Sequence, residues 1–203
     1  MKPRLFIAID FPEKTKKEIA GLTRQLKSKY PYIRWEKKEN LHLTLKFLGW
    51  VETKLKAQNS NVKTTTQNLK LQKIIKGMEK SVQGVRPFWF QPEKLGYFLG
   101  QSLIVWLGVK TEQRLFQTVK NLEKEMAKLG FRKERRVFSA HITIARAKRI
   151  VPRKKWQRIA NEIRNFPTPI FSKFKVSEIV LMKSQLTPKG SIYTVVNKVS
   201  QWF

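Results

Sequence analysis

The sequence predicts an α+β fold with two pseudo-symmetric lobes, each an antiparallel sheet with helices on its outer face, around a central cleft. The strongest reason is a repeated motif. The chain has 203 residues and only two histidines, and they open matching segments, His42-Leu43-Thr44-Leu45 and His141-Ile142-Thr143-Ile144. Because each of the two histidines begins a copy of the same motif, we expect two related structural units that act together.

The spacing before each motif supports the same fold. Asp10 lies 32 residues before His42, and Thr111 lies 30 residues before His141. Each interval fits a strand end, a helix and the motif strand. Residues 1–203 are therefore interpreted as a single two-lobed domain, with duplicated units at approximately 4–85 and 102–165 and C-terminal strands at 169–198.

The first unit begins with the apolar run 4–10, which predicts a buried strand. Asp10 is the expected N-cap of the following helix, because Pro12 and Glu13 come directly after it as in many helix starts. The other elements expected here are, in order, a helix with Ile19, Leu22 and Leu26 on one face, a short strand at 33–36, the motif strand 41–48, a polar loop at 53–66 and a helix at 67–83.

The second unit repeats this order. Thr111 is the expected cap of a helix that ends at Gly130. The expected elements are strand pieces at 87–90 and 97–99, a strand at 102–109, the capped helix, the motif strand 138–145, a helix at 153–165, and strands at 169–175, 177–183 and 191–198 with a turn at 188–190.

Composition excludes several classes of protein. The chain has no cysteine, which excludes a disulfide framework, a thiol nucleophile and a thiolate metal site. Two histidines are too few for most catalytic zinc sites, so we expect no metal and no cofactor. No apolar run reaches membrane-spanning length, and no signal peptide opens the chain. We expect a cytoplasmic monomer that does not bind membranes.

The charge points to a polyanionic partner. Lys and Arg number 43 against 14 Asp and Glu, a formal net charge of +29. Basic residues gather on both sides of the second motif, at 132–136 and 146–155, which is the pattern expected of a phosphate-binding surface. The alternative is a solvated face whose bias reflects genome composition or habitat.

Strand alternation places the motif side chains. Leu43, Leu45 and Phe47 should point to the core, as should Ile142 and Ile144. His42, Thr44 and Lys46 should share the opposite face, as should His141 and Thr143, with each His about 7 Å from its Thr. A phosphoryl group can bridge that gap, and histidine exchanges protons near neutral pH. A lone His beside a Thr is more often structural, and the duplication is what favours a functional site.

At the level of these motifs the chain resembles the two-histidine phosphoesterases, and within them the RNA 2',3'-cyclic phosphodiesterase (2'-5' RNA ligase) family. The resemblance rests on the strand 4–10, Arg34-Trp35, the run 40–49 and the run 138–146. Two departures are Ala140, where the family usually has Pro, and the polar stretch 51–66.

The resemblance implies metal-independent hydrolysis of RNA 2',3'-cyclic phosphate ends to 2'-phosphomonoesters, with 2'-5' ligation as the reverse reaction and tRNA fragments among the candidate substrates. It implies that His42 is the proton donor to the leaving 3'-oxygen and His141 the proton acceptor from water. Thr44 and Thr143 would bind the non-bridging oxygens, and Arg146 the substrate phosphate. By strand parity Arg146 opposes His141, so it reaches the site only if the strand ends or twists at Ala145.

Two other functions fit the same residues. One is a non-catalytic basic RNA-binding module, although pure binding would not need an intact histidine pair. The other is a phosphodiesterase of the same fold that acts on 2'-5' oligoadenylates or small cyclic nucleotides.

Overall fold

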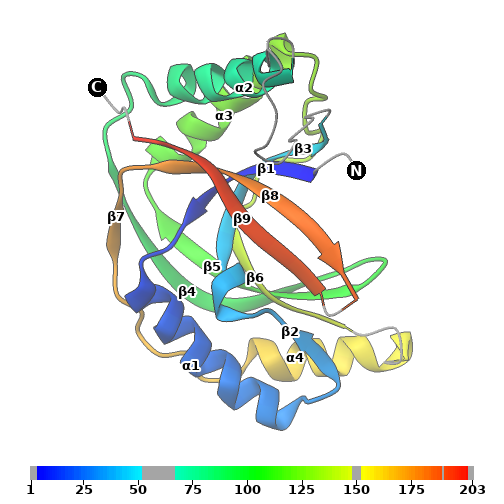
Figure 1. Cartoon of the computed structure of the whole chain (residues 1–203). Coiled ribbons are helices and arrows are strands. Elements are labelled where there is room, and N and C mark those ends of the chain that lie inside the picture. The colour runs from blue at the N-terminus through cyan, green and yellow to red at the C-terminus, as the bar shows by residue number, and fades with distance from the viewer. Residues whose placement is uncertain (1–3, 52–66, 148–151, 189, 201–203) are drawn as a thin grey trace.

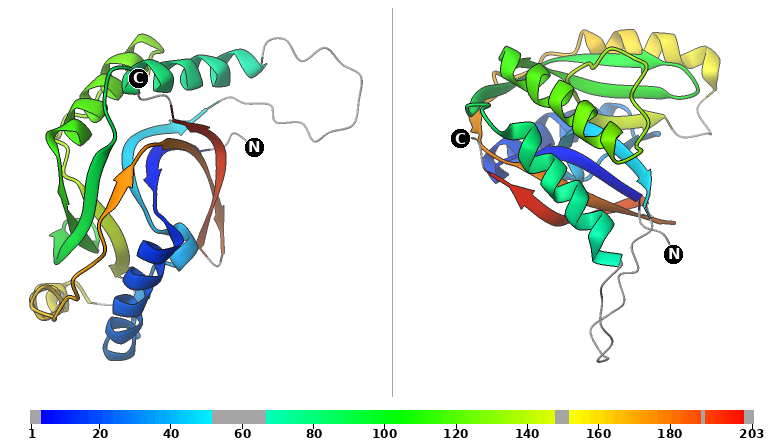
Figure 2. Two further views of the ribbon diagram at one scale, coloured as in Figure 1. Left: turned by 90° about the vertical axis from the view of Figure 1, so that its left-hand side faces the viewer. Right: turned by 90° about the horizontal axis from the view of Figure 1, so that it is seen from above.

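The computed structural model describes residues 4–51, 67–147, 152–188 and 190–200, and confirms the two-sheet α+β architecture. The expected polar loop at 53–66 lies outside these ranges. The first sheet has four strands in the order β3-β1-β8-β9, with all neighbours antiparallel. Its strands are β1 (Arg4–Asp10), β3 (His42–Trp50), β8 (Ile179–Thr187) and β9 (Gly190–Val199). Figure 2 shows that this sheet is strongly curled.

The second sheet has five antiparallel strands in the order β2-β6-β5-β4-β7. Its strands are β2 (Ile33–Trp35), β4 (Phe88–Leu99), β5 (Leu103–Thr111), β6 (His141–Ala147) and β7 (Phe174–Val176). Each sheet combines strands from distant parts of the chain. In one sheet β2 pairs with β6, and in the other β8 and β9 join β1 and β3. The motif strands β3 and β6 belong to different sheets and pack against each other.

Four α-helices cover the described part of the chain. They are α1 (Glu13–Lys29), α2 (Gln67–Val82), α3 (Gln113–Lys128) and α4 (Trp156–Arg164). Helices α2 and α3 pack together at one end of the molecule, where α3 contacts β3 and α2 contacts β9 (Figure 1). Helices α1 and α4 lie at the other end, where α1 contacts β2 and α4 contacts β4 and β5.

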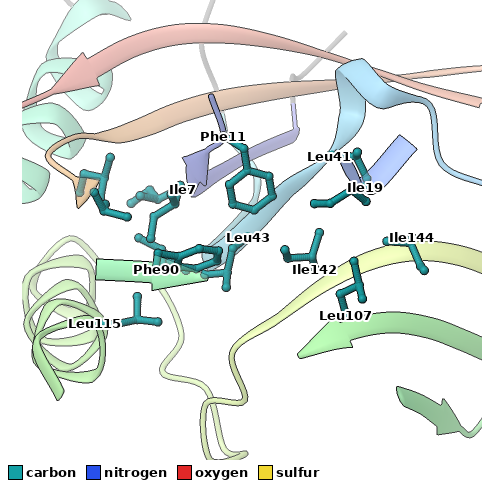
Figure 3. Close-up of a cluster of buried hydrophobic side chains, with 14 of the residues drawn as sticks. Ile7, Phe11, Ile19, Leu41, Leu43, Phe90, Leu107, Leu115, Ile142 and Ile144 are labelled. Atoms are coloured by element: carbon teal, nitrogen blue, oxygen red, sulfur yellow. The ribbon is translucent and has the colours of Figure 1, made fainter. Parts of the chain in front are cut away.

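One large apolar cluster lies between the elements. Leu43 of β3 and Ile142 of β6, the second residues of the two motifs, both point into it (Figure 3). Phe11, Leu107 and Phe90 fill the space around them, and all five side chains are buried. Because neighbouring strand residues point to opposite faces, this core packing turns each motif histidine away from the cluster.

Several expected boundaries were wrong. Neither Asp10 nor Thr111 caps a helix, since the N-cap positions are Pro12 and Glu112 and neither makes a side-chain capping bond. Asp10 instead accepts a hydrogen bond from the Phe11 N–H at 2.9 Å and forms an ion pair with Lys16 at 2.6 Å.

Three strand and helix lengths also differ. The two strand pieces expected at 87–90 and 97–99 are one strand, β4, whose pairing is irregular between Pro92 and Leu95. The strand expected at 169–175 is reduced to β7. The helix expected at 153–165 begins as a short 3-10 turn at Arg153–Lys155 before α4.

Candidate active site

Each motif strand carries a β-bulge at the fourth residue of its motif. In β3, Lys46 lies opposite Ile7 and Thr44 lies opposite Ala8, so Leu45 is an extra residue without a direct partner. In β6, Ala145 lies opposite Val105 and Thr143 lies opposite Trp106, so Ile144 is the extra residue. A bulge shifts the alternation of side chains by one position, and it re-aims every residue that follows.

In β3 the bulge reverses the two orientations expected after Leu45. Lys46 points into the protein and is 2 % exposed, whereas Phe47 is 57 % exposed. The Phe47 ring lies 6.1 Å from the ring of Phe6 on the same face as His42. The expectation that Lys46 shares a face with His42 and that Phe47 belongs to the core was therefore wrong, because simple alternation does not survive the bulge.

In β6 the same shift buries Ala145 and turns Arg146 onto the face of His141. The Arg146 guanidinium lies 3.8 Å from the carboxylate of Glu36, just after β2. Its positive charge contributes to lowering the pKa of both His42 and His141, so Arg146 lies within electrostatic range of the two rings. The bulge supplies the twist at Ala145 that strand parity required.

The His42 ring is fixed at both nitrogens. Its Nδ1 lies 2.6 Å from the carbonyl oxygen of Asn40, and its Nε2 lies 3.0 Å from Thr44 Oγ1. A carbonyl only accepts hydrogen bonds, so Nδ1 carries the proton and the Thr44 hydroxyl donates to Nε2 when the ring is neutral. Asn40 is itself held, because its side-chain Nδ2 donates to the Ser191 carbonyl at 2.9 Å.

The His141 ring repeats half of this arrangement. Its Nδ1 lies 2.7 Å from the carbonyl oxygen of Ser139, again two residues upstream. The proton is therefore on Nδ1 in both neutral rings, and Nε2 is the nitrogen that can accept one. Thr143 follows His141 on the same face of β6, opposite Trp106.

Burial lowers the pKa of both histidines below the usual value. For His42 the opposing influences are the Asn40 carbonyl and the Asp10 carboxylate, which raise the pKa, while Lys16 and Arg146 lower it further. For His141 the Ser139 carbonyl raises the pKa and Arg146 lowers it. Both rings are thus mainly neutral at neutral pH before a ligand binds.

Aromatic side chains surround each histidine. Phe6 lies 4.9 Å and Tyr193 lies 5.1 Å from the His42 ring. The sequence did not identify either residue, because both come to the site through strand pairing in the curled sheet, which leaves no local pattern.

The His141 ring has Phe98 at 5.0 Å and Trp106 at 6.3 Å. Gly96 makes room for this indole, since a Cβ at position 96 would lie 2.2 Å from the Trp106 ring. Trp106 Nε1 is buried and has no hydrogen-bond partner within the described residues. These neighbours of His141 were likewise missed from sequence.

The basic groups around the second motif are described only in part. Residues 132–136 lie on the segment between α3 and β6, and their Arg and Lys side chains are exposed. Lys154 and Lys155 are also exposed, in the 3-10 turn before α4. Lys148 and Arg149 lie outside the described residues.

The described residues contain neither a cluster of metal-ligating side chains nor a membrane-spanning helix. Within those ranges, no three His, Cys, Asp or Glu side chains gather in a way that could hold a metal ion. No described helix is both long and apolar enough to cross a membrane.

The arrangement of paired histidine strands has a counterpart among known families. The family model of LigT-like phosphoesterases matches the chain twice, at residues 9–106 and 107–193. The chain belongs to the LigT-like phosphoesterase family. The family membership predicted from the motifs is thereby confirmed, and the protein is a phosphoesterase.

Relatives in this family match over nearly the full length. The RNA 2',3'-cyclic phosphodiesterase of Methanocaldococcus jannaschii is 34% identical over 197 residues, which are 96% of this chain and 99% of that protein. The protein of the same name from Thermotoga maritima is 33% identical over 195 residues, 95% of this chain and 92% of its own.

Solved structures agree with the fold of this LigT-like phosphoesterase. A Thermus thermophilus protein superposes with a TM-score of 0.73 over 98% of both chains at 21% identity, a likeness of fold alone. E. coli LigT in complex with 3'-AMP superposes with a TM-score of 0.69 at 25% identity, over 98% of this chain and 97% of its own.

Proposed function

We propose that this LigT-like phosphoesterase hydrolyses the 2',3'-cyclic phosphate at RNA 3' ends to a 2'-phosphomonoester, by metal-independent acid–base catalysis. The observation that carries the proposal is the matched setting of His42 and His141, each held through Nδ1 by a carbonyl two residues upstream, with Arg146 in range of both. The names of the full-length relatives support the choice of substrate.

The reaction needs one proton acceptor and one proton donor. His141 Nε2 takes a proton from water, whose oxygen forms the new bond to phosphorus. The bond from phosphorus to the 3'-oxygen breaks, and His42 Nε2 gives that oxygen its proton. Each such proton transfer is typically worth about 10²–10⁴-fold in rate.

The surroundings support this assignment, which the two motifs alone leave open. The Asp10 carboxylate raises the pKa of His42, and no carboxylate does so for His141 among the described residues. Asp10 is thus the one described negative charge that favours the protonated form of either ring, as a donor requires, and it acts on His42 against burial, Lys16 and Arg146. His141 has only the Arg146 cation as a charged influence, which favours the neutral form that a base requires.

The remaining polar groups bind the phosphate. The Thr44 hydroxyl, which contacts His42 Nε2 in the free protein, turns to a non-bridging oxygen when the donor is protonated. Thr143 binds another non-bridging oxygen beside His141, and Arg146 neutralises the charge that gathers on these oxygens in the transition state.

The decisive assay uses an oligoribonucleotide that ends in a 2',3'-cyclic phosphate, with a chelator present, and identifies which phosphomonoester forms. We expect the 2' isomer, and a loss of orders of magnitude in turnover for His42→Ala and for His141→Ala. Thr44→Val and Thr143→Val should cost less, about 10–100-fold, for one lost hydrogen bond to a charged oxygen. Full activity in either histidine variant contradicts the mechanism, and activity abolished by chelation points to a metal.

The biological setting belongs to the same proposal. The substrates are RNA ends, tRNA fragments among them, and the protein acts as a cytoplasmic monomer that also catalyses 2'-5' ligation in reverse. A purely RNA-binding module would bind the same oligonucleotide and leave its end intact. Hydrolysis confined to 2'-5' oligoadenylates or small cyclic nucleotides would show the alternative substrate class.

A further inference from the structure

The face of β3 that carries His42 extends well beyond the motif. A second irregularity lies at Leu48, because Phe47 is opposite Phe6 while Gly49 is opposite Leu5. Together with the bulge at Leu45, it keeps positions 42, 44, 47 and 50 on one face and the intervening leucines in the core. The side chains of this face become more exposed with distance from His42, and Phe47 and Trp50 are 57 % and 59 % exposed.

A cation accompanies the exposed indole at the far end. Arg4 lies directly opposite Trp50 in the pairing of β1 with β3, and its guanidinium carbon lies 5.8 Å from the centre of the Trp50 ring. Arg4 shares its face of β1 with Phe6, whose ring contacts His42 at 4.9 Å. Arg4 and Trp50 therefore lie on the histidine face of the four-stranded sheet.

We propose that Arg4 and Trp50 bind an unpaired nucleotide of the RNA, several positions 5' to the nucleotide that carries the cyclic phosphate. The base stacks on the indole, and the guanidinium binds a neighbouring phosphate. This inference rests on the proposed function, since it assumes that the RNA end is held at His42 and His141. It deepens that function by naming the substrate as RNA with several unpaired 3' nucleotides.

The chemistry of the pair favours nucleic acid as its occupant. An exposed indole offers a π-face to any base, and an adjacent cation holds the backbone, which is how single strands are bound without sequence preference. The formal net charge of +29 draws polyanions to this surface and disfavours basic protein partners.

Geometry separates this site from the catalytic one. Eight residues of strand at about 3.3 Å each, shortened by two bulges, put Trp50 roughly 20–25 Å from His42. A stacked strand advances about 3.4 Å per nucleotide, so the base on Trp50 is several nucleotides from the reacting end. A cyclic mononucleotide bound at His42 does not reach the indole.

The test compares Trp50→Ala with Trp89→Ala in the full-length protein. Trp89 is a matched control, because it is 48 % exposed and has the Lys173 ammonium 5.0 Å from its ring, but it lies on β4 of the other sheet. The measured quantity is the kcat/KM for a single-stranded decaribonucleotide cyclic phosphate divided by that for a cyclic mononucleotide. We expect Trp50→Ala to lower this ratio about 5- to 150-fold, the range that loss of one base–aromatic stack produces. Trp50→Phe should lower this ratio less than Trp50→Ala does.

Two further arms make the result decisive. Fluorescence anisotropy with a labelled decaribonucleotide measures binding without hydrolysis, so a failure of the proposed reaction is distinguishable from a failure of this site. A hairpin paired to its last nucleotide should bind the wild-type protein more weakly than the single strand, and Trp50→Ala should remove the difference. Equal ratios and equal affinities for the wild-type, Trp50→Ala and Trp89→Ala proteins would overturn the proposal.

Discussion

Replacement of Lys46 by Met tests the bulged geometry of β3 most directly, because this lysine is buried only if the bulge at Leu45 exists. Its Nζ lies 2.8 Å and 2.9 Å from the two carboxylate oxygens of Glu123 in α3, and 2.6 Å from the Arg132 carbonyl oxygen. The side chain is 1% exposed against 20% for Glu123. Glu123 also accepts the Glu134 N–H at 3.2 Å, so the pair holds the start of the basic segment 132–136 against α3.

The expected cost follows from what the substitution leaves behind. Removal of one partner of a buried ion pair typically costs about 3–5 kcal/mol, because the other charge stays in the protein unpaired. Glu123 is partly exposed and water can solvate it, so we expect the lower end, about 3 kcal/mol. That is a large share of the roughly 5–15 kcal/mol by which native proteins are stable. The double variant Lys46→Met/Glu123→Leu should recover most of the loss, because an apolar pair of similar volume often replaces a buried ion pair at little cost.

Urea unfolding followed by circular dichroism measures these free energies, and the double-mutant cycle isolates the pair. The matched control is Lys128→Met, which removes the ion pair between an exposed lysine, 56% exposed against 1% for Lys46, and Glu125 in the same helix as Glu123. Exposed pairs are worth about 0–1 kcal/mol, so this variant should unfold nearly as the wild type does. If Lys46→Met is no more costly than Lys128→Met, Lys46 faces solvent and the bulge is wrong.

Three other outcomes are expected. Burial lowers the pKa of His42 and His141 in the folded protein, so between the folded-state pKa values and about 6.5 the unfolded chain binds more protons than the folded one. The free energy of unfolding should therefore fall as the pH drops through that window and stay level above it. The slope should be weaker in the His→Gln variants. Gly96→Ala should displace the Trp106 ring beside His141 and lower kcat. Near-ultraviolet circular dichroism should show the change at the indole, and an unchanged spectrum would contradict this expectation. Long-RNA affinity should fall about 10³–10⁵-fold between 50 and 200 mM salt if 6–10 phosphates are engaged, and neutral substitutions within 132–136 should flatten that slope, whereas an unchanged slope would mark these residues as a solvated face.

Sequence patterns predicted most of the order of helices and strands, because apolar periodicity is a local property of the chain. They did not predict which sheet each strand would join. The short strand β2 follows α1 yet pairs with β6, more than 100 residues later. Strand pairing is decided by tertiary packing, and nothing in Ile33–Trp35 encodes a partner. The same limit hid Tyr193, which reaches His42 from the last strand of the curled sheet.

The bulges explain why simple alternation predicts the orientation of side chains before Leu45 and fails for those after it. Before the bulge, alternation holds and His42 and Thr44 share a face as expected, although their direct hydrogen bond at 3.0 Å was not expected. After it, Lys46 and Phe47 exchange roles. The sequence of β6 contains one weak indication of its bulge, because Ile144 and Ala145 are consecutive apolar residues. One such pair does not distinguish a bulge from an ordinary strand.

The two bulges also bear on how a repeated motif could serve the two different chemical roles that we propose for it. They occur at the same motif position, so the next side chain to return to the histidine face is Phe47 in one strand and Arg146 in the other. One strand thus adds an aromatic surface on the face of its histidine, and the other adds a cation whose charge lowers the pKa of both rings. Only His42 has a carboxylate, Asp10, raising its pKa among the described groups. The duplication itself stays a prediction, but a donor and an acceptor must differ in proton affinity, and identical motifs acquire that difference only from neighbours that the bulges and strand pairing bring to them.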